Sequence, residues 1–93
     1  MDPNEGQLPN RTTVLPLHLF VFDALLQFTE NKVRDPTLAP EIVEMLWEQI
    51  RLLQLLLAVG VQPWTPENGE LAGEIAAAFR QLQRETDALQ HNN

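Results

Sequence analysis

The side chains that could do acid–base chemistry in this sequence are few and scattered. Its two histidines are His18 and His91. His18 has no carboxylate three or four residues further on that could orient its imidazole, because Asp23 is five residues away. His91 lies two residues from the last residue, in a segment expected to fray. The pattern favours structural or solvated histidines over a general base.

Two pairs of glutamates have a spacing that could hold a hard cation. Glu44 and Glu48 are four residues apart, as are Glu70 and Glu74. Solvated helix faces carry glutamates in the same way, and both pairs fall in the N-terminal halves of predicted helices, where the helix dipole favours negative charge. The glutamates are therefore interpreted as surface residues, and no metal site is predicted.

The remaining reactive groups do not form a catalytic pattern either. The chain has no cysteine, which excludes disulfides, thiolate nucleophiles and cysteine zinc sites. Its only hydroxyl side chains are threonines, and no histidine can be placed beside one of them. No glycine-rich phosphate loop is present. The sequence predicts a protein that is not an enzyme and has no cofactor; a small metal-dependent enzyme is the most distant alternative.

The charge balance limits the partners of the chain. With 13 acidic and 6 basic residues among 93, the formal net charge is −7. Such a surface does not neutralise nucleic-acid phosphates and is not attracted to an anionic membrane. The N-terminus does not resemble a signal peptide and no apolar run reaches the roughly 20 residues of a membrane span, so a cytoplasmic protein is expected.

The apolar periodicity predicts an all-α fold. Residues 1–13 are polar, lack periodicity and are predicted to form a disordered tail, followed by one domain over residues 14–90. Helices are expected over 16–34, 40–59 and 66–90. Asp35-Pro36 ends the first helix, Thr37 could cap the second, and Thr65-Pro66 begins the third. The expected architecture is an antiparallel helical hairpin plus a third amphipathic helix.

Two of these helices have more apolar surface than one neighbour can cover. The first has one apolar face containing Val21 and Phe28 and a second containing Leu19 and Phe22, and the second half of helix 40–59 is apolar on two sides. We therefore expect dimerisation to complete the bundle. The residues predicted at the dimer contact are Leu19, Phe22, Leu26, Met45, Leu52, Leu55, Leu56 and Val59.

A contact for a different protein is predicted at Trp64 and at an acidic stripe. Trp64 lies in a loop that two prolines stiffen, which suits an interface anchor. Packing of the indole against the start of the third helix is the alternative. The stripe consists of Glu41, Glu44 and Glu48.

The function that fits these features is a non-catalytic, homodimeric protein–protein interaction module, such as an adaptor, assembly factor or regulatory subunit. The second interpretation is an acidic inhibitor that imitates nucleic acid and blocks a basic site on a target protein.

Overall fold

The computed structural model describes residues 19–91, which form three helices and no strand. They are α2 (Leu19–Lys32), α3 (Pro40–Gly60) and α4 (Pro66–His91). The prediction of an all-α fold is confirmed for this part of the chain. The expected tail over 1–13 and the expected helix start at Pro16 lie outside the described residues.

The connection between α2 and α3 is a turn built around Asp35. Its Oδ1 atom accepts hydrogen bonds from the backbone N–H of Thr37 at 2.9 Å and from the hydroxyl of Thr37 at 2.7 Å. Thr37 therefore does not cap α3, as its sequence position suggested; the residue before that helix is Ala39, which has no side-chain cap. The two hydrogen bonds favour the charged carboxylate and lower the pKa of Asp35.

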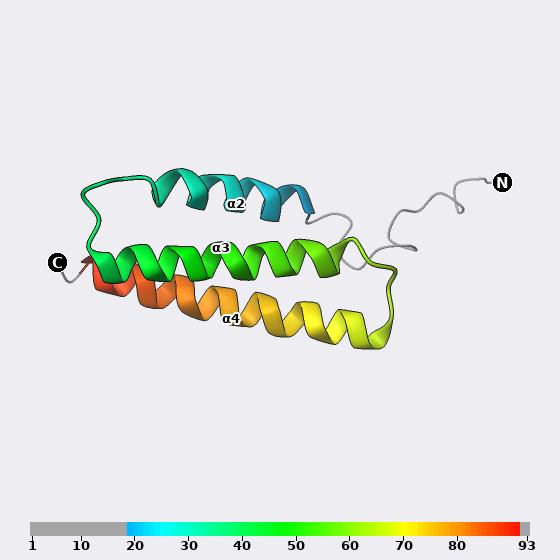
Figure 1. The fold of residues 1–93 in the computed structure, drawn as a ribbon. Coiled ribbons are helices and arrows are strands. Elements are labelled where there is room, and N and C mark those ends of the chain that lie inside the picture. The colour runs from blue at the N-terminus through cyan, green and yellow to red at the C-terminus, as the bar shows by residue number, and fades with distance from the viewer. Residues whose placement is uncertain (1–18, 92–93) are drawn as a thin grey trace.

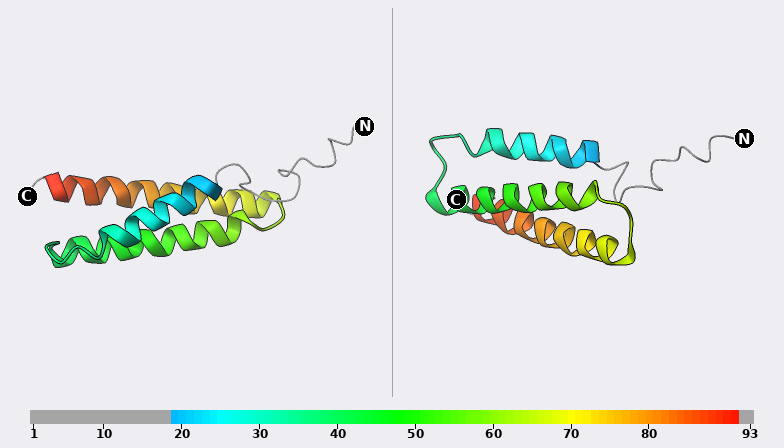
Figure 2. Two further views of the ribbon diagram at one scale, coloured as in Figure 1. Left: turned by 90° about the horizontal axis from the view of Figure 1, so that it is seen from above. Right: turned by 45° about the vertical axis from the view of Figure 1, so that its right-hand side comes forward.

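The three helices lie roughly antiparallel to their neighbours in the chain, with α3 between α2 and α4 (Figure 1). Seen from above, α2 crosses the α3–α4 pair obliquely (Figure 2). Its N-terminal half carries Phe22, which packs against a buried cluster of Leu56, Ala72 and Ile75. Side chains from all three helices therefore meet at this point.

Most of the buried apolar side chains belong to α3. Ile42, Leu46, Ile50, Leu53 and Leu56 are buried there, whereas α4 contributes Ala72, Ile75 and Phe79. These α3 positions recur at three- and four-residue intervals, the spacing that places them along one side of a helix. Half-buried Leu52 and Val59 extend the same core.

A hydrogen bond between two buried polar side chains joins α3 to α4. The Nε2 atom of Gln49 donates to Oγ1 of Thr86 at 2.9 Å, and that hydroxyl donates in turn to the backbone oxygen of Leu82 at 2.7 Å. Both polar residues are buried. The bond lies on the same face of α4 as the buried residues Ala72, Ile75 and Phe79, and it favours that face at the contact with α3.

The side of α4 that packs against α3 does not include all of the large apolar residues of that helix. Leu71 and Leu89 are large apolar residues of α4, yet both are exposed. The buried positions include Ala72 and Thr86 instead. A small residue and a hydrogen-bonded one lie at the contact with α3, and the two leucines flank it.

Replacing Thr86 tests the buried hydrogen bond. Thr86→Val leaves the amide of Gln49 buried without its acceptor, which costs about 1–3 kcal/mol. Thr29→Val is the matched control, because Thr29 is also buried and its hydroxyl donates to the backbone oxygen of Leu25 within the same helix. Urea unfolding followed by circular dichroism should show a clearly larger loss for Thr86→Val; equal losses would contradict the role of Gln49.

The Asp35 turn gives a second prediction, on pH. Because the folded-state pKa of Asp35 is lowered, its hydrogen bonds stabilise the turn above the ordinary carboxyl pKa and are lost as pH falls through the folded-state value. An NMR titration of the Asp35 carboxyl carbon should give a pKa below the usual aspartate value. Thr37→Val removes the hydroxyl donor and should raise that pKa; an unchanged value would exclude this hydrogen bond as a cause.

Candidate interaction surface

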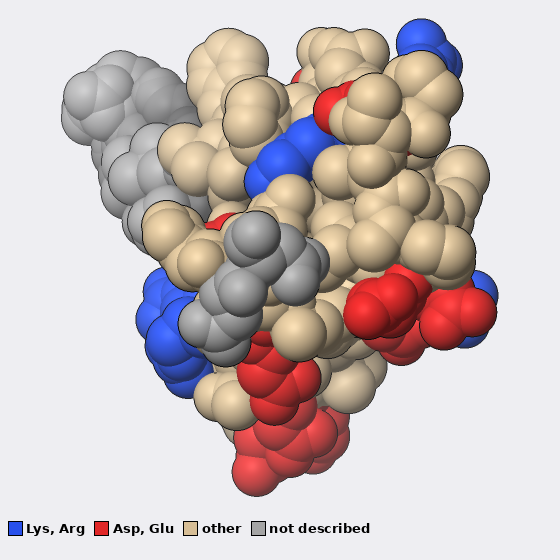
Figure 3. Space-filling view, turned by 90° about the vertical axis from the view of Figure 1, so that its left-hand side faces the viewer, with Lys and Arg blue, Asp and Glu red and all other residues tan. Residues whose placement is uncertain are grey.

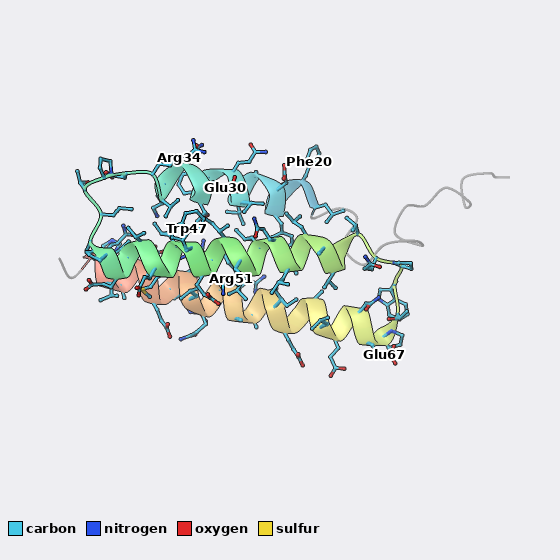
Figure 4. The ribbon with its side chains drawn as sticks, in the orientation of Figure 1. Phe20, Glu30, Arg34, Trp47, Arg51 and Glu67 are labelled. Carbon is cyan, nitrogen blue, oxygen red and sulfur yellow. The ribbon has the colours of Figure 1, made fainter. Side chains whose placement is uncertain are left out.

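The outward side of α2 carries apolar side chains that the fold leaves uncovered. Phe20 is 82% exposed and Phe28 is 61% exposed, and Val21 and Ala24 beside them are also exposed. We call these four residues the outer α2 face. Phe20 projects from α2 away from α3 (Figure 4). Apolar residues scattered singly on a surface are normal, but two phenylalanines two helical turns apart form a continuous strip that is typical of a binding surface.

The opposite side of α2 provides its contact with the rest of the molecule. Thr29 is buried, and Leu19, Phe22, Leu25 and Leu26 are partly buried. Three of these residues, Leu19, Phe22 and Leu26, were predicted at a dimer contact. In the structure the partial burial of that side comes from this chain, with Phe22 packed against the cluster around Leu56.

The predicted dimer residues of α3 do not form one free surface. Leu56 is 0% exposed and belongs to the internal core, so a second copy cannot reach it in this fold. Leu52 and Val59 pack against the same core and Met45 is partly buried, whereas Leu55 is exposed. Sequence periodicity could not separate these positions, because it shows that a residue is apolar and not which neighbour covers it.

A small pocket lies between the C-terminal end of α2 and the N-terminal half of α3. It has a volume of about 250 Å³ and is lined by Glu30, Val33, Arg34 and Trp47. Figure 4 shows Glu30 and Arg34 on α2 and its connection, near Trp47 on α3. Trp47 is 54% exposed and supplies an aromatic wall. The volume lies below the usual range of small-molecule sites, about 300–1,000 Å³, and suits a single apolar side chain.

Trp64 lies against the first turn of α4. A Cβ atom added at Gly69 would be 3.3 Å from the indole Nε1, so the ring occupies space that the glycine leaves open. The loop is held by Thr65, whose hydroxyl accepts the N–H of Asn68 at 3.0 Å, and by the Asn68 amide, which donates to the Pro63 oxygen at 3.0 Å. Trp64 is still 56% exposed, so part of the ring is free for contact.

The acidic stripe lies far from that tryptophan along the molecule. Glu41, Glu44 and Glu48 are exposed in the N-terminal half of α3, and Glu48 pairs with Arg51 at 3.6 Å. The α3–α4 connection that carries Trp64 lies at the opposite end of α3 (Figure 1). The structure therefore does not bring the stripe and Trp64 together within one chain.

Much of the acidic surface lies over α3 and α4. Figure 3 views the end of the molecule that holds the α2–α3 connection, and most of the acidic side chains visible there gather in the lower half, below α2. Of the charged residues within α2, Asp23 and Glu30 are acidic and Lys32 is basic. The ammonium of Lys32 lies 5.7 Å from the ring centre of Phe28. The outer α2 face is thus bordered by few charges.

Between residues 19 and 91, no group of three or more histidine, cysteine, aspartate or glutamate side chains is placed to hold a metal ion. His91 Nδ1 lies 2.8 Å from the backbone oxygen of Asp87, and His18 lies outside the described residues. None of the helices in the described part of the chain is both long and apolar enough to cross a membrane.

Comparison of the chain with protein-family models, with curated proteins and with solved structures finds no match in any of the three.

The contact of Trp64 with Gly69 predicts different outcomes for two glycine substitutions in α4. An alanine inside a helix is about 1 kcal/mol more favourable than glycine. Gly73→Ala should gain most of this, because nothing lies within 4 Å of the added Cβ. Gly69→Ala should gain less and should shift the indole N–H resonance of Trp64. Urea unfolding and NMR measure both effects; equal gains with an unmoved resonance would contradict the contact.

Proposed function

We propose that this chain is a non-catalytic protein–protein interaction module that binds through the outer α2 face. The observation that carries the proposal is the exposure of Phe20, Val21 and Phe28 on one side of a helix whose other side is packed on α3. Covering such a phenylalanine stabilises a complex by about 1.5–3 kcal/mol relative to leaving it in water. An apolar surface on a partner would cover the outer α2 face and so complete the helical bundle of α2, α3 and α4.

The pattern of exposure supports binding by apolar contact more than by charge. Aromatic side chains at the centre of an interface supply most of its affinity, whereas exposed acidic residues mainly affect association rate and specificity. Trp47, beside the pocket, and Trp64 are further exposed aromatic residues. Contact of a partner with Trp64 or with the stripe of Glu41, Glu44 and Glu48 remains a prediction.

A paired substitution tests the proposal. Phe20→Gln with Phe28→Gln removes both anchors and introduces polar side chains that are compatible with a helix. Loss of about 2 kcal/mol, the scale of an interface anchor, weakens binding about 30-fold. We expect this loss for whichever protein the wild-type chain binds in native extract, a second copy included, as measured by titration of the purified pair.

The matched control is Leu55→Gln with Val61→Gln, which replaces two exposed apolar residues outside α2. Both double variants should unfold at the wild-type urea concentration, because surface substitutions usually change stability by no more than about 0.5 kcal/mol. Binding that persists in the Phe20/Phe28 variant would contradict the proposal. Binding that fades as salt rises from about 50 to 500 mM would instead favour the acidic inhibitor.

A further inference from the structure

We propose that the outer α2 face binds the same face of a second copy of this chain, as an antiparallel helix pair whose twofold axis passes beside Ala24. The inference rests on the function proposed above and names the partner. It also differs from the dimer contact that the sequence predicts, which includes the inward residues Leu19, Phe22 and Leu26.

The first argument is the symmetry of the outer α2 face. Phe20, Ala24 and Phe28 are spaced four residues apart, so they form one ridge with a large residue at each end and a small one in the middle. Apart from the Lys32 ammonium, which lies 5.7 Å from the ring centre of Phe28, the ridge presents the same order of side chains from either end. A surface with that property can meet its own copy about a twofold axis, with Phe20 of one chain against Phe28 of the other at both ends.

The second argument is the geometry of crossing helices. Ridges of residues four apart pack against each other when two helices cross at about −50°. Such helices are closest at the crossing point and diverge on both sides of it. Ala24 at the crossing permits close approach, and the phenylalanines fill the widening space at the ends.

The third argument is charge. Two copies that each carry a net charge of −7 repel one another, so their contact must avoid the acidic surfaces of α3 and α4. Within α2, Asp23, Glu30 and Lys32 leave a net charge of −1 (two acidic residues, one basic residue), and the carboxylate of Asp23 accepts a hydrogen bond from Gln27 at 3.1 Å. Of the exposed side chains along the flank of the ridge, Gln27 and Asn31 are neutral and Asp23 is acidic. The outer α2 face has no cluster of acidic side chains that would pair with a strongly basic partner. A second copy presents the same apolar surface.

The size of the face sets the strength of the contact. A phenylalanine buries about 150–250 Å², so the four exposed phenylalanines of a pair bury on the order of 600 Å². Stable interfaces bury about 1,200–2,000 Å². We therefore expect a reversible dimer whose population rises with concentration through the micromolar range and increases with salt, because salt screens the repulsion between the copies.

Site-specific cross-linking tests the arrangement on a chain that has no native cysteine. A disulfide forms when two Cα atoms are about 4.4–6.8 Å apart. Ala24→Cys should therefore form a linked dimer under mild oxidation at least about tenfold faster than Ala58→Cys or Ala77→Cys, which are also exposed helical alanines. Phe20→Cys should not link to itself, because an antiparallel pair places the two copies of residue 20 at opposite ends of the contact.

The outcomes separate this inference from the proposed function. Equal cross-linking rates for the three alanine positions, or self-linking of Phe20→Cys as in a parallel pair, would overturn the arrangement. Sedimentation equilibrium provides a second test without cysteine: wild type should dimerise, and Phe20→Gln with Phe28→Gln should remain monomeric. If wild type is monomeric while this double variant loses a different protein, the second copy is excluded and the interaction module is retained.

Discussion

The apolar character of α3 is the constraint on which the rest of the structure depends. Five of the eight buried apolar residues between residues 19 and 91 belong to this helix. A helix that is apolar on two sides, as α3 is in its second half, must be covered by more than one neighbour. The chain supplies α4 on one side and α2 on another (Figure 1). Each covering helix can turn only one side toward α3, so a helix with two apolar sides leaves one exposed. The outer α2 face follows from this arrangement.

Within the core, one polar contact complements the apolar packing. Apolar contacts are roughly proportional to area and are weakly directional, so they permit several rotations of α4 against α3. The bond from Gln49 to Thr86 requires a specific geometry, and leaving either group buried without a partner is unfavourable. The bond therefore favours, together with the burial of Ile75 and Phe79, the rotation of α4 that places Ala72 and Thr86 at the helix contact and Leu71 and Leu89 beside it.

Charge and apolar surface are distributed so that they favour one kind of contact. The net charge of −7 keeps copies of the chain apart at long range, and much of it resides on α3 and α4. The outer α2 face has few charges and two exposed phenylalanines. Association through this face therefore involves little charge repulsion and removes two exposed phenylalanines of each chain from water. These two effects are the physical basis of both proposals.

The sequence by itself determined the helical class and the approximate extent of each helix. Apolar residues at three- and four-residue intervals and the prolines at positions 36, 40 and 66 carry this information locally, since both act through a few neighbouring residues. The end of α2 near Asp35-Pro36 and the start of α4 after Thr65 follow from the same local rules. A surplus of apolar surface was also evident, because it needs only a count of residues on each helix face.

Only the tertiary structure decided which apolar side of α2 faces α3. Both sides satisfy the helical period, and Phe22 and Phe28 are the same residue type, yet one is packed against the core and the other is exposed. The choice depends on the combined shape of α3 and α4, where Leu56, Ala72 and Ile75 offer a place for one phenylalanine. That place is formed by residues up to 53 positions away in the chain, and no local pattern contains it.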